Sequence, residues 1–186
     1  MQKSIVWEGL HYDTEEHCNI NYLDEAIIVR SELEGWALTI PVYVEYVLRL
    51  DLYWNVVELD INFTVGQALF AYLLFRDAEG EWTDVDGKAF PEFKGCNYVD
   101  ISLTPFTNTL PVKGSRWIQG QRQQTDVLYI DILANQLRKD TQYYTLLSPN
   151  NYRFENDGGN FTADIIVDED GFVTHYPQLF EMLKPI

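Results

Sequence analysis

Apolar and polar residues alternate along most of the chain, which is the pattern of half-buried β-strands. The clearest run spans residues 57–65, where every second side chain is apolar and those between are acidic, Asn or Thr. Three further runs place apolar residues on one strand face: Tyr46, Leu48, Leu50, Leu52 and Trp54; Leu128, Ile130 and Ile132; Phe161, Ala163, Ile165 and Val167. The pattern predicts about a dozen strands.

Turn residues separate these runs. Residues 77–80, 84–87 and 168–171 each begin with Asp and end with Gly, which readily adopts the positive φ of tight hairpins. Residues 156–159, Asn-Asp-Gly-Gly, predict another turn, and Pro41 should divide residues 36–50 or place them at a sheet edge. The short spacings favour an antiparallel meander.

One polar insert interrupts the strand pattern. Thr104 can cap a helix that begins at Pro105, and Pro111 should end that helix within about two turns. Residues 176–183 predict a second short helix that closes an open end. With so few helices, the sheet must fold back on itself as a sandwich, barrel or roll. A curved sheet wrapped around residues 104–110 would enclose Phe106 and Leu110, and we expect one domain over residues 1–186.

The charge limits the possible partners. The 186 residues carry a net charge of −16, with a pI of about 4.3, which disfavours nucleic acid and anionic bilayers. The longest apolar run is far shorter than the roughly 20 residues of a membrane-spanning helix, and the chain does not begin with an apolar signal core, so we expect no integral membrane association. Cys18 and Cys96 match no metal or disulfide spacing, which favours buried, reduced thiols and a cytoplasmic location.

Several segments resemble one bacterial family. They are Gly95-Cys96, Val99-Asp100, the block Thr-Pro-Phe-Thr-Asn-Thr-Leu-Pro at 104–111, and the closing Val-Asp-Glu-Asp-Gly-Phe-Val at 167–173 with Tyr176-Pro177. The chain resembles, over nearly its whole length, the putative glycolipid-binding family, a domain of unknown function. The resemblance implies a mainly β spiral β-roll, in which a long, mostly antiparallel sheet winds around one short helix. It also implies a homodimer and a glycolipid or similar amphiphile as ligand.

Two groups of residues are candidates for contact with such a ligand. Hydroxyl and amide groups of the insert can hydrogen-bond a head group, and aromatic residues with a polar atom can line an amphipathic wall. The candidates are Tyr46, Trp54, Asp100, Thr104, Thr107, Asn108, Trp117 and Tyr143. The alternative is structural and is favoured about two to one: the polar groups satisfy the helix ends, and the aromatic residues pack in the core or a dimer interface.

Catalytic chemistry has weaker support. The sequence contains no Gly-rich phosphate loop, no nucleophile elbow and no metal-ligand spacing, so we expect neither a cofactor nor a metal. His17 and Cys18 would point to opposite strand faces, which argues against a thiol–base pair. Three hypotheses remain open: a non-catalytic amphiphile-binding protein, an enzyme that acts on a small or sugar-bearing substrate with Asp100 or His175 as general acid or base, and a structural dimeric module with a filled interior.

Overall fold

A computed structural model describes residues 1–156 and 160–183. Within these residues, fourteen strands form one sheet in the order β7-β6-β5-β4-β3-β2-β1-β14-β13-β12-β11-β10-β9-β8. The first seven strands are β1 (Gln2–Gly9), β2 (Asp13–Tyr22), β3 (Ile27–Ala37), β4 (Ile40–Leu50), β5 (Val56–Val65), β6 (Ala68–Arg76) and β7 (Trp82–Asp84). The others are β8 (Tyr98–Ile101), β9 (Arg122–Asp131), β10 (Gln136–Ser148), β11 (Asn151–Asn156), β12 (Phe161–Val167), β13 (Val173–Tyr176) and β14 (Phe180–Leu183). Among the described strands, only β8 and β9 pair in parallel; the other neighbours are antiparallel.

The alternating pattern predicts the faces of the long strands correctly. In β5, Leu59, Ile61 and Phe63 are fully buried, whereas Asn62 is exposed. The run from Tyr46 to Trp54 is shorter than predicted, because β4 ends at Leu50. The Asp51 carboxylate accepts hydrogen bonds from the backbone N–H groups of Tyr53 and Asn55, and these bonds form a turn.

The predicted turns are confirmed where the structure describes them. Leu38 and Thr39 separate β3 from β4, so that Pro41 lies at the start of a strand, opposite Trp36. The carboxylates of Asp84 and Asp168 each accept two backbone N–H groups within their own turns. The turn predicted at residues 156–159 lies largely outside the described residues.

The second helix predicted over residues 176–183 is wrong. Residues 180–183 form β14, which pairs with β13 on one side and with β1 on the other. This strand joins the N-terminal and C-terminal halves into one sheet. Backbone groups of β1 would otherwise lie at an open edge, and pairing them outweighs the local helical pattern.

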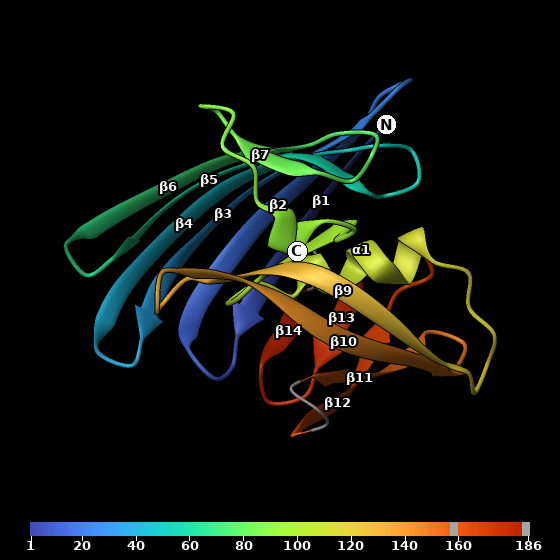
Figure 1. Cartoon of the computed structure of the whole chain (residues 1–186). Helices are drawn as coiled ribbons and strands as arrows, with labels where there is room; N and C mark the ends of the chain where they lie inside the picture. The colour runs from blue at the N-terminus through green and yellow to red at the C-terminus, as the bar shows by residue number, and fades with distance from the viewer. Residues whose placement is uncertain (157–159, 184–186) are drawn as a thin grey trace.

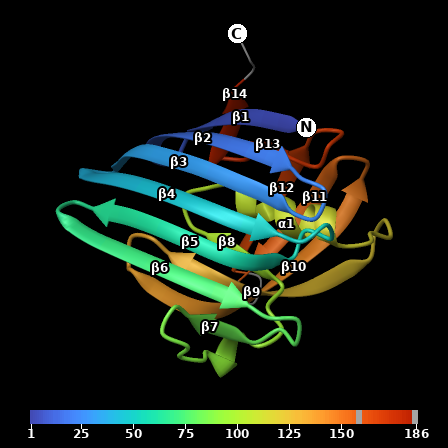
Figure 2. The same ribbon diagram turned by 90° about the horizontal axis from the view of Figure 1, so that it is seen from above.

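The sheet curls around one short α-helix, as the resemblance implied. Helix α1 (Phe106–Gly114) lies between the layer of β1–β6 and the layer of β9–β12, and Phe106 to Val112 are all buried (Figures 1 and 2). A 3-10 turn, η1 (Pro91–Phe93), precedes β8. The prediction that Pro111 ends the helix is wrong, because α1 continues to Gly114. Pro111 lacks an N–H for the Thr107 carbonyl, and enclosure by the core compensates for this missing bond.

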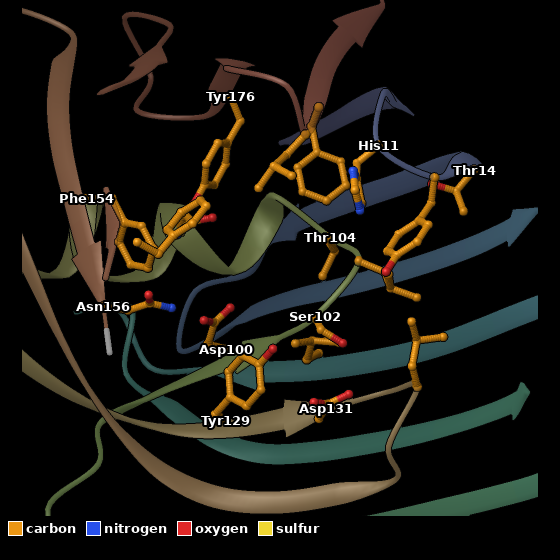
Figure 3. Close-up of a pocket in the computed structure, with 18 of the residues that line it drawn as sticks. His11, Thr14, Asp100, Ser102, Thr104, Tyr129, Asp131, Phe154, Asn156 and Tyr176 are labelled. Atoms are coloured by element: carbon orange, nitrogen blue, oxygen red, sulfur yellow. The ribbon is translucent and has the colours of Figure 1, made fainter. Parts of the chain in front are cut away.

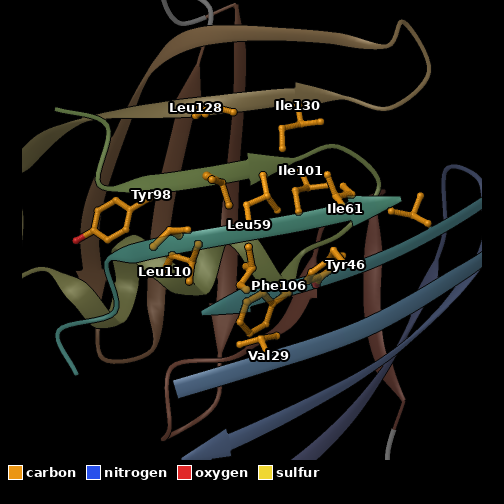
Figure 4. Close-up of a cluster of buried hydrophobic side chains, with 14 of the residues drawn as sticks. Val29, Tyr46, Leu59, Ile61, Tyr98, Ile101, Phe106, Leu110, Leu128 and Ile130 are labelled. Carbon is orange, nitrogen blue, oxygen red and sulfur yellow. The ribbon is translucent and has the colours of Figure 1, made fainter. Parts of the chain in front are cut away.

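The helix contributes to both parts of the core. Phe106 and Leu110 belong to the larger cluster, which fills the space between β1–β6 and β8–β9 (Figure 4). Val112 belongs to a smaller cluster with Tyr144, Phe154 and other residues of β10–β13. The described helices are too short and too polar to cross a bilayer.

Candidate functional site

A pocket of about 580 Å³ opens inside the roll beside the start of α1. This volume is typical of small-molecule sites, and its position is next to the insert that the sequence singled out. Figure 3 shows Asp100 and Tyr129 between Phe154 on one side and His11 and Thr14 on the other. The lining residues are His11, Tyr12, Thr14, Asp100, Ile101, Ser102, Leu103, Thr104, Asn108, Tyr129, Asp131, Leu133, Ala134, Phe154, Asn156, Phe161, Tyr176, Leu179 and Phe180.

Asp100 is one of two half-buried carboxylates that line this pocket, the other being Asp131. The Oδ1 atom of Asp100 accepts a hydrogen bond from Thr107 Oγ1 at 2.9 Å, and its Oδ2 accepts one from Gln142 Nε2 at 2.6 Å. Desolvation raises the pKa of Asp100, and these two donors offset part of that rise. The carboxylate is therefore held in one orientation and retains lone pairs for further donors.

The residues that open α1 form another wall of the pocket. Thr104 Oγ1 accepts the N–H of Phe106 at 3.0 Å, and Asn108 Nδ2 donates to Tyr144 Oη at 2.9 Å. The Thr104 bond is of the kind that the structural interpretation expected, whereas Asn108 pairs with a side chain and not with a helix end. Leu103, which lines the pocket just before the helix, has a φ of 74°. A left-handed leucine costs about 1–2 kcal/mol, so the fold holds this turn against local strain.

A buried acid lies behind this wall. Glu16 is 2% exposed, and its Oε1 accepts hydrogen bonds from Ser31 Oγ and Tyr46 Oη, both at 2.7 Å. Its Oε2 has no hydrogen-bond partner among the described atoms. Desolvation raises the pKa of Glu16. The sequence analysis missed this residue, although its inward place in the alternating pattern of β2 was visible.

The far end of the pocket is aromatic. Phe154, Phe161, Tyr176 and Phe180 form a chain of ring contacts whose centroids lie 6.0–6.4 Å apart. The rings come from four different strands, β11 to β14, that the curled sheet brings together. This end offers a ligand an apolar surface that water solvates poorly.

Charge is distributed unevenly around the pocket. Its carboxylates are Asp100 and Asp131, and none of the described residues that line it is Lys or Arg. Burial and the nearby charge of Asp100 raise the pKa of Tyr129 to about 12, so its hydroxyl stays protonated at neutral pH. Such a surface suits uncharged hydroxyl groups and disfavours anions.

The structure places three of the predicted site residues in the pocket: Asp100, Thr104 and Asn108. Two others lie directly behind its wall. Thr107 donates to Asp100, and Tyr46 donates to the buried Glu16. Their roles in ligand contact stay predictions.

The remaining three predicted residues lie away from the pocket lining. Trp54 has a φ of 69° and packs against Tyr22 and Phe172. Trp117 donates to the Val112 carbonyl at 2.8 Å. Tyr143 stacks under the Arg122 guanidinium, 3.4 Å from its ring centroid.

Most of the aromatic end was not predicted. Phe154, Tyr176 and Phe180 belong to strands that meet only in the folded sheet, and His11 comes from a turn more than 140 residues earlier. Apart from the alternation that turns these side chains inward, the sequence offers no signal that groups them.

The catalytic candidates separate in space. Asp100 lines the pocket, whereas His175 does not and pairs with Glu181 on the neighbouring strand. Cys18 is buried and His17 exposed, so the two face opposite sides of β2, as the strand geometry predicts. Both cysteines are free and buried. Among the described residues, no three His, Cys, Asp or Glu side chains gather as a metal site would require.

The fold and the pocket define an open β-roll that is filled by one helix and contains an amphipathic cavity. The model of a family described as putative glycolipid-binding matches residues 4–182, and the chain belongs to this family. The crystal structure of a DUF1089 family protein from Pseudomonas aeruginosa is 34% identical, with a TM-score of 0.82 over 91% of this chain and 92% of that one. No curated protein matches the chain significantly.

Proposed function

We propose that the protein binds an uncharged glycolipid, or an amphiphile of similar character, in this pocket without transforming it. One observation carries the proposal: a single cavity of about 580 Å³ joins a polar wall to an aromatic end. The family description points to the same class of ligand. A filled interior, which the structural alternative requires, would leave no such cavity.

The polar wall favours a head group rich in hydroxyls. The Asp100 carboxylate accepts hydrogen bonds, and the protonated Tyr129 hydroxyl both donates and accepts them. A phosphate or sulfate would meet Asp100 and Asp131 without a described Lys or Arg in the lining to compensate its charge. A neutral sugar satisfies these groups at no such cost.

The aromatic end favours an acyl chain. Phe154, Phe161 and Phe180 present rings from three strands, and burial of each methylene contributes about 0.8 kcal/mol. Several methylenes therefore suffice for measurable affinity even where polar contacts are few.

Obstruction of the pocket entrance should weaken lipid binding. Ala134 is an exposed lining residue of the β9–β10 turn, so Ala134→Trp places a large ring there without disturbing the core. We expect the lipid recovered by organic extraction and mass spectrometry to fall about tenfold, equivalent to about 1.4 kcal/mol. Ala78→Trp, in the exposed turn after β6, is the matched control and should retain the lipid of the unmodified protein.

Two results would count against this function. One is the absence of co-purified lipid together with no rise in melting temperature on addition of lipid. The other is an equal loss of lipid in both tryptophan variants. Tyr129→Phe refines the test, because loss of one hydrogen bond should weaken a glycosylated ligand about three- to tenfold and its deglycosylated form much less.

We further propose that the protein is a homodimer, as the family resemblance implies, and that it lies in the bacterial cytoplasm, which its free, buried thiols favour. Light scattering should give twice the chain mass of 21.7 kDa, and cell fractionation should recover most of the protein in the soluble cytosolic fraction. A mass of one chain at micromolar concentration would refute the dimer.

A further inference from the structure

Three neighbouring hairpin turns expose large apolar side chains at one end of the sheet. The turns β1–β2, β3–β4 and β5–β6 lie side by side at the same end of the strands, because β1 to β6 are consecutive and antiparallel in the sheet (Figure 1). We call their exposed apolar residues the apolar rim: Leu10, Trp36, Leu38, Ile40 and Leu69, which are 48%, 50%, 81%, 44% and 72% exposed.

The apolar rim adjoins the entrance of the pocket. The backbone N–H of Leu10 donates to the carbonyl of Leu179, a lining residue, at 2.8 Å. His11, the next residue, is exposed and lines the pocket, as does Ala134 of the β9–β10 turn. A ligand that enters between these turns therefore passes beside the rim.

Leu38 has no evident role within the chain. Its φ of 59° is left-handed, a conformation that favours Gly or Asn in a hairpin turn, and its side chain is 81% exposed. The strain of this leucine brings little packing in return. A surface outside the chain would supply that packing.

Charge selects the kind of surface. Within the described segments that form the apolar rim, residues 9–13, 36–40 and 65–69, there is no Lys or Arg, and Asp13 lies among them. Glu8 and Glu34 flank the turns in a shallow groove that includes Trp36. An anionic bilayer would be repelled by these carboxylates, whereas an electrically neutral bilayer would not.

We propose that the apolar rim docks the protein on an electrically neutral lipid surface. The rim inserts into the boundary between head groups and acyl chains, in the manner of interfacial apolar side chains. If the proposed function also holds, docking places the pocket entrance next to the lipid it takes up; this second step depends on that function, whereas docking itself does not.

Flotation with vesicles tests the docking. The unmodified protein should float with phosphatidylcholine vesicles and float less with vesicles that contain phosphatidylglycerol. The double variant Leu38→Asn and Leu69→Ser should reduce the vesicle-bound fraction about tenfold, because it removes two exposed apolar side chains. Asn tolerates the backbone at residue 38, so this variant should keep the melting temperature of the unmodified protein.

Leu52→Ser is the matched control. Leu52 is 54% exposed in the β4–β5 turn, at the opposite end of the same strands, and its replacement should leave flotation unchanged. Docking through the apolar rim is refuted if the double variant floats like the unmodified protein, or if Leu52→Ser lowers the vesicle-bound fraction as much as the double variant does. Stronger binding to the vesicles in the presence of phosphatidylglycerol would refute it as well. It is also refuted if the double variant turns a dimer into a monomer, which would identify the rim as a contact between copies.

The pocket variant separates docking from ligand binding. Ala134→Trp should still float while it carries about tenfold less lipid. Unmodified protein that carries lipid but never floats would overturn the docking and leave the proposed function intact. Protein that floats through the rim but never carries lipid would support docking and overturn the proposed function.

Discussion

Replacement of Phe106 by alanine is expected to lower the free energy of unfolding by about 3–5 kcal/mol. Phe106 is fully buried, its ring centroid lies 6.4 Å from that of Tyr46, and it joins the helix to the surrounding sheet (Figure 4). The cavity left by the ring would be enclosed by the larger core cluster, which cannot collapse without moving several strands.

Urea denaturation followed by tryptophan fluorescence measures this loss. Tyr53→Ala removes an aromatic ring that is 78% exposed and should change the free energy of unfolding by no more than about 0.5 kcal/mol. Equal effects of the two substitutions would show that the helix is not the packing centre of the roll.

Replacement of Glu16 by glutamine is expected to stabilise the protein at pH 8 and to have little effect at pH 4. Burial raises the pKa of Glu16 above the ordinary value of 4.5. As the pH rises from that value through the raised pKa, the unfolded chain releases this proton first, so the folded state of the unmodified protein loses stability. Glutamine has no proton to lose.

The size of the effect follows from the burial of this carboxylate. Glutamine Oε1 can keep the hydrogen bonds from Ser31 and Tyr46, while its amide takes the place of Oε2 beside the Thr104 hydroxyl, which offsets part of the rise in the Glu16 pKa. Removal of that buried charge should raise the free energy of unfolding by about 1–3 kcal/mol at pH 8. Urea titrations at both pH values measure it, with the exposed Glu32→Gln as control.

A Glu16→Gln protein that is less stable at pH 8 would contradict this account. In that case the Glu16 carboxylate would be ionised in the folded protein, and hydrogen-bond donors around it would stabilise its charge. Such a result would leave the pocket itself unaffected, because Glu16 does not line it.

Much of the fold could be predicted from local pattern. Alternation located the inward faces of β5 and β12, and the Asp-to-Gly turns located the hairpins at Asp84 and Asp168. Both signals depend on neighbours in sequence, since strand faces alternate with a period of two and a turn closes over four residues. The failures arose where distant pairing decides, as in β14, whose partner β1 lies at the other end of the chain.

The candidate site could be predicted only in part. Thr104 and Asn108 lie in the polar insert and Asp100 lies in the strand just before it, so their closeness in sequence marked them. Phe154, Tyr176 and His11 carry no local signal for a site, because each belongs to an ordinary strand or turn. Trp54 and Trp117 matched the chemistry of a ligand wall equally well, yet they pack elsewhere.

The amino-acid sequence by itself determined that this chain forms a sheet-rich protein with a short helix at the polar insert, and that it is strongly acidic. Those properties follow from periodicity, turn chemistry and composition, which are local or additive. Only the tertiary structure decided that an aromatic end and a carboxylate share one pocket beside an apolar rim. Pairing of β14 with β1 joins the two halves of the sheet, and the long-range packing that brings these residues together has no counterpart in sequence spacing.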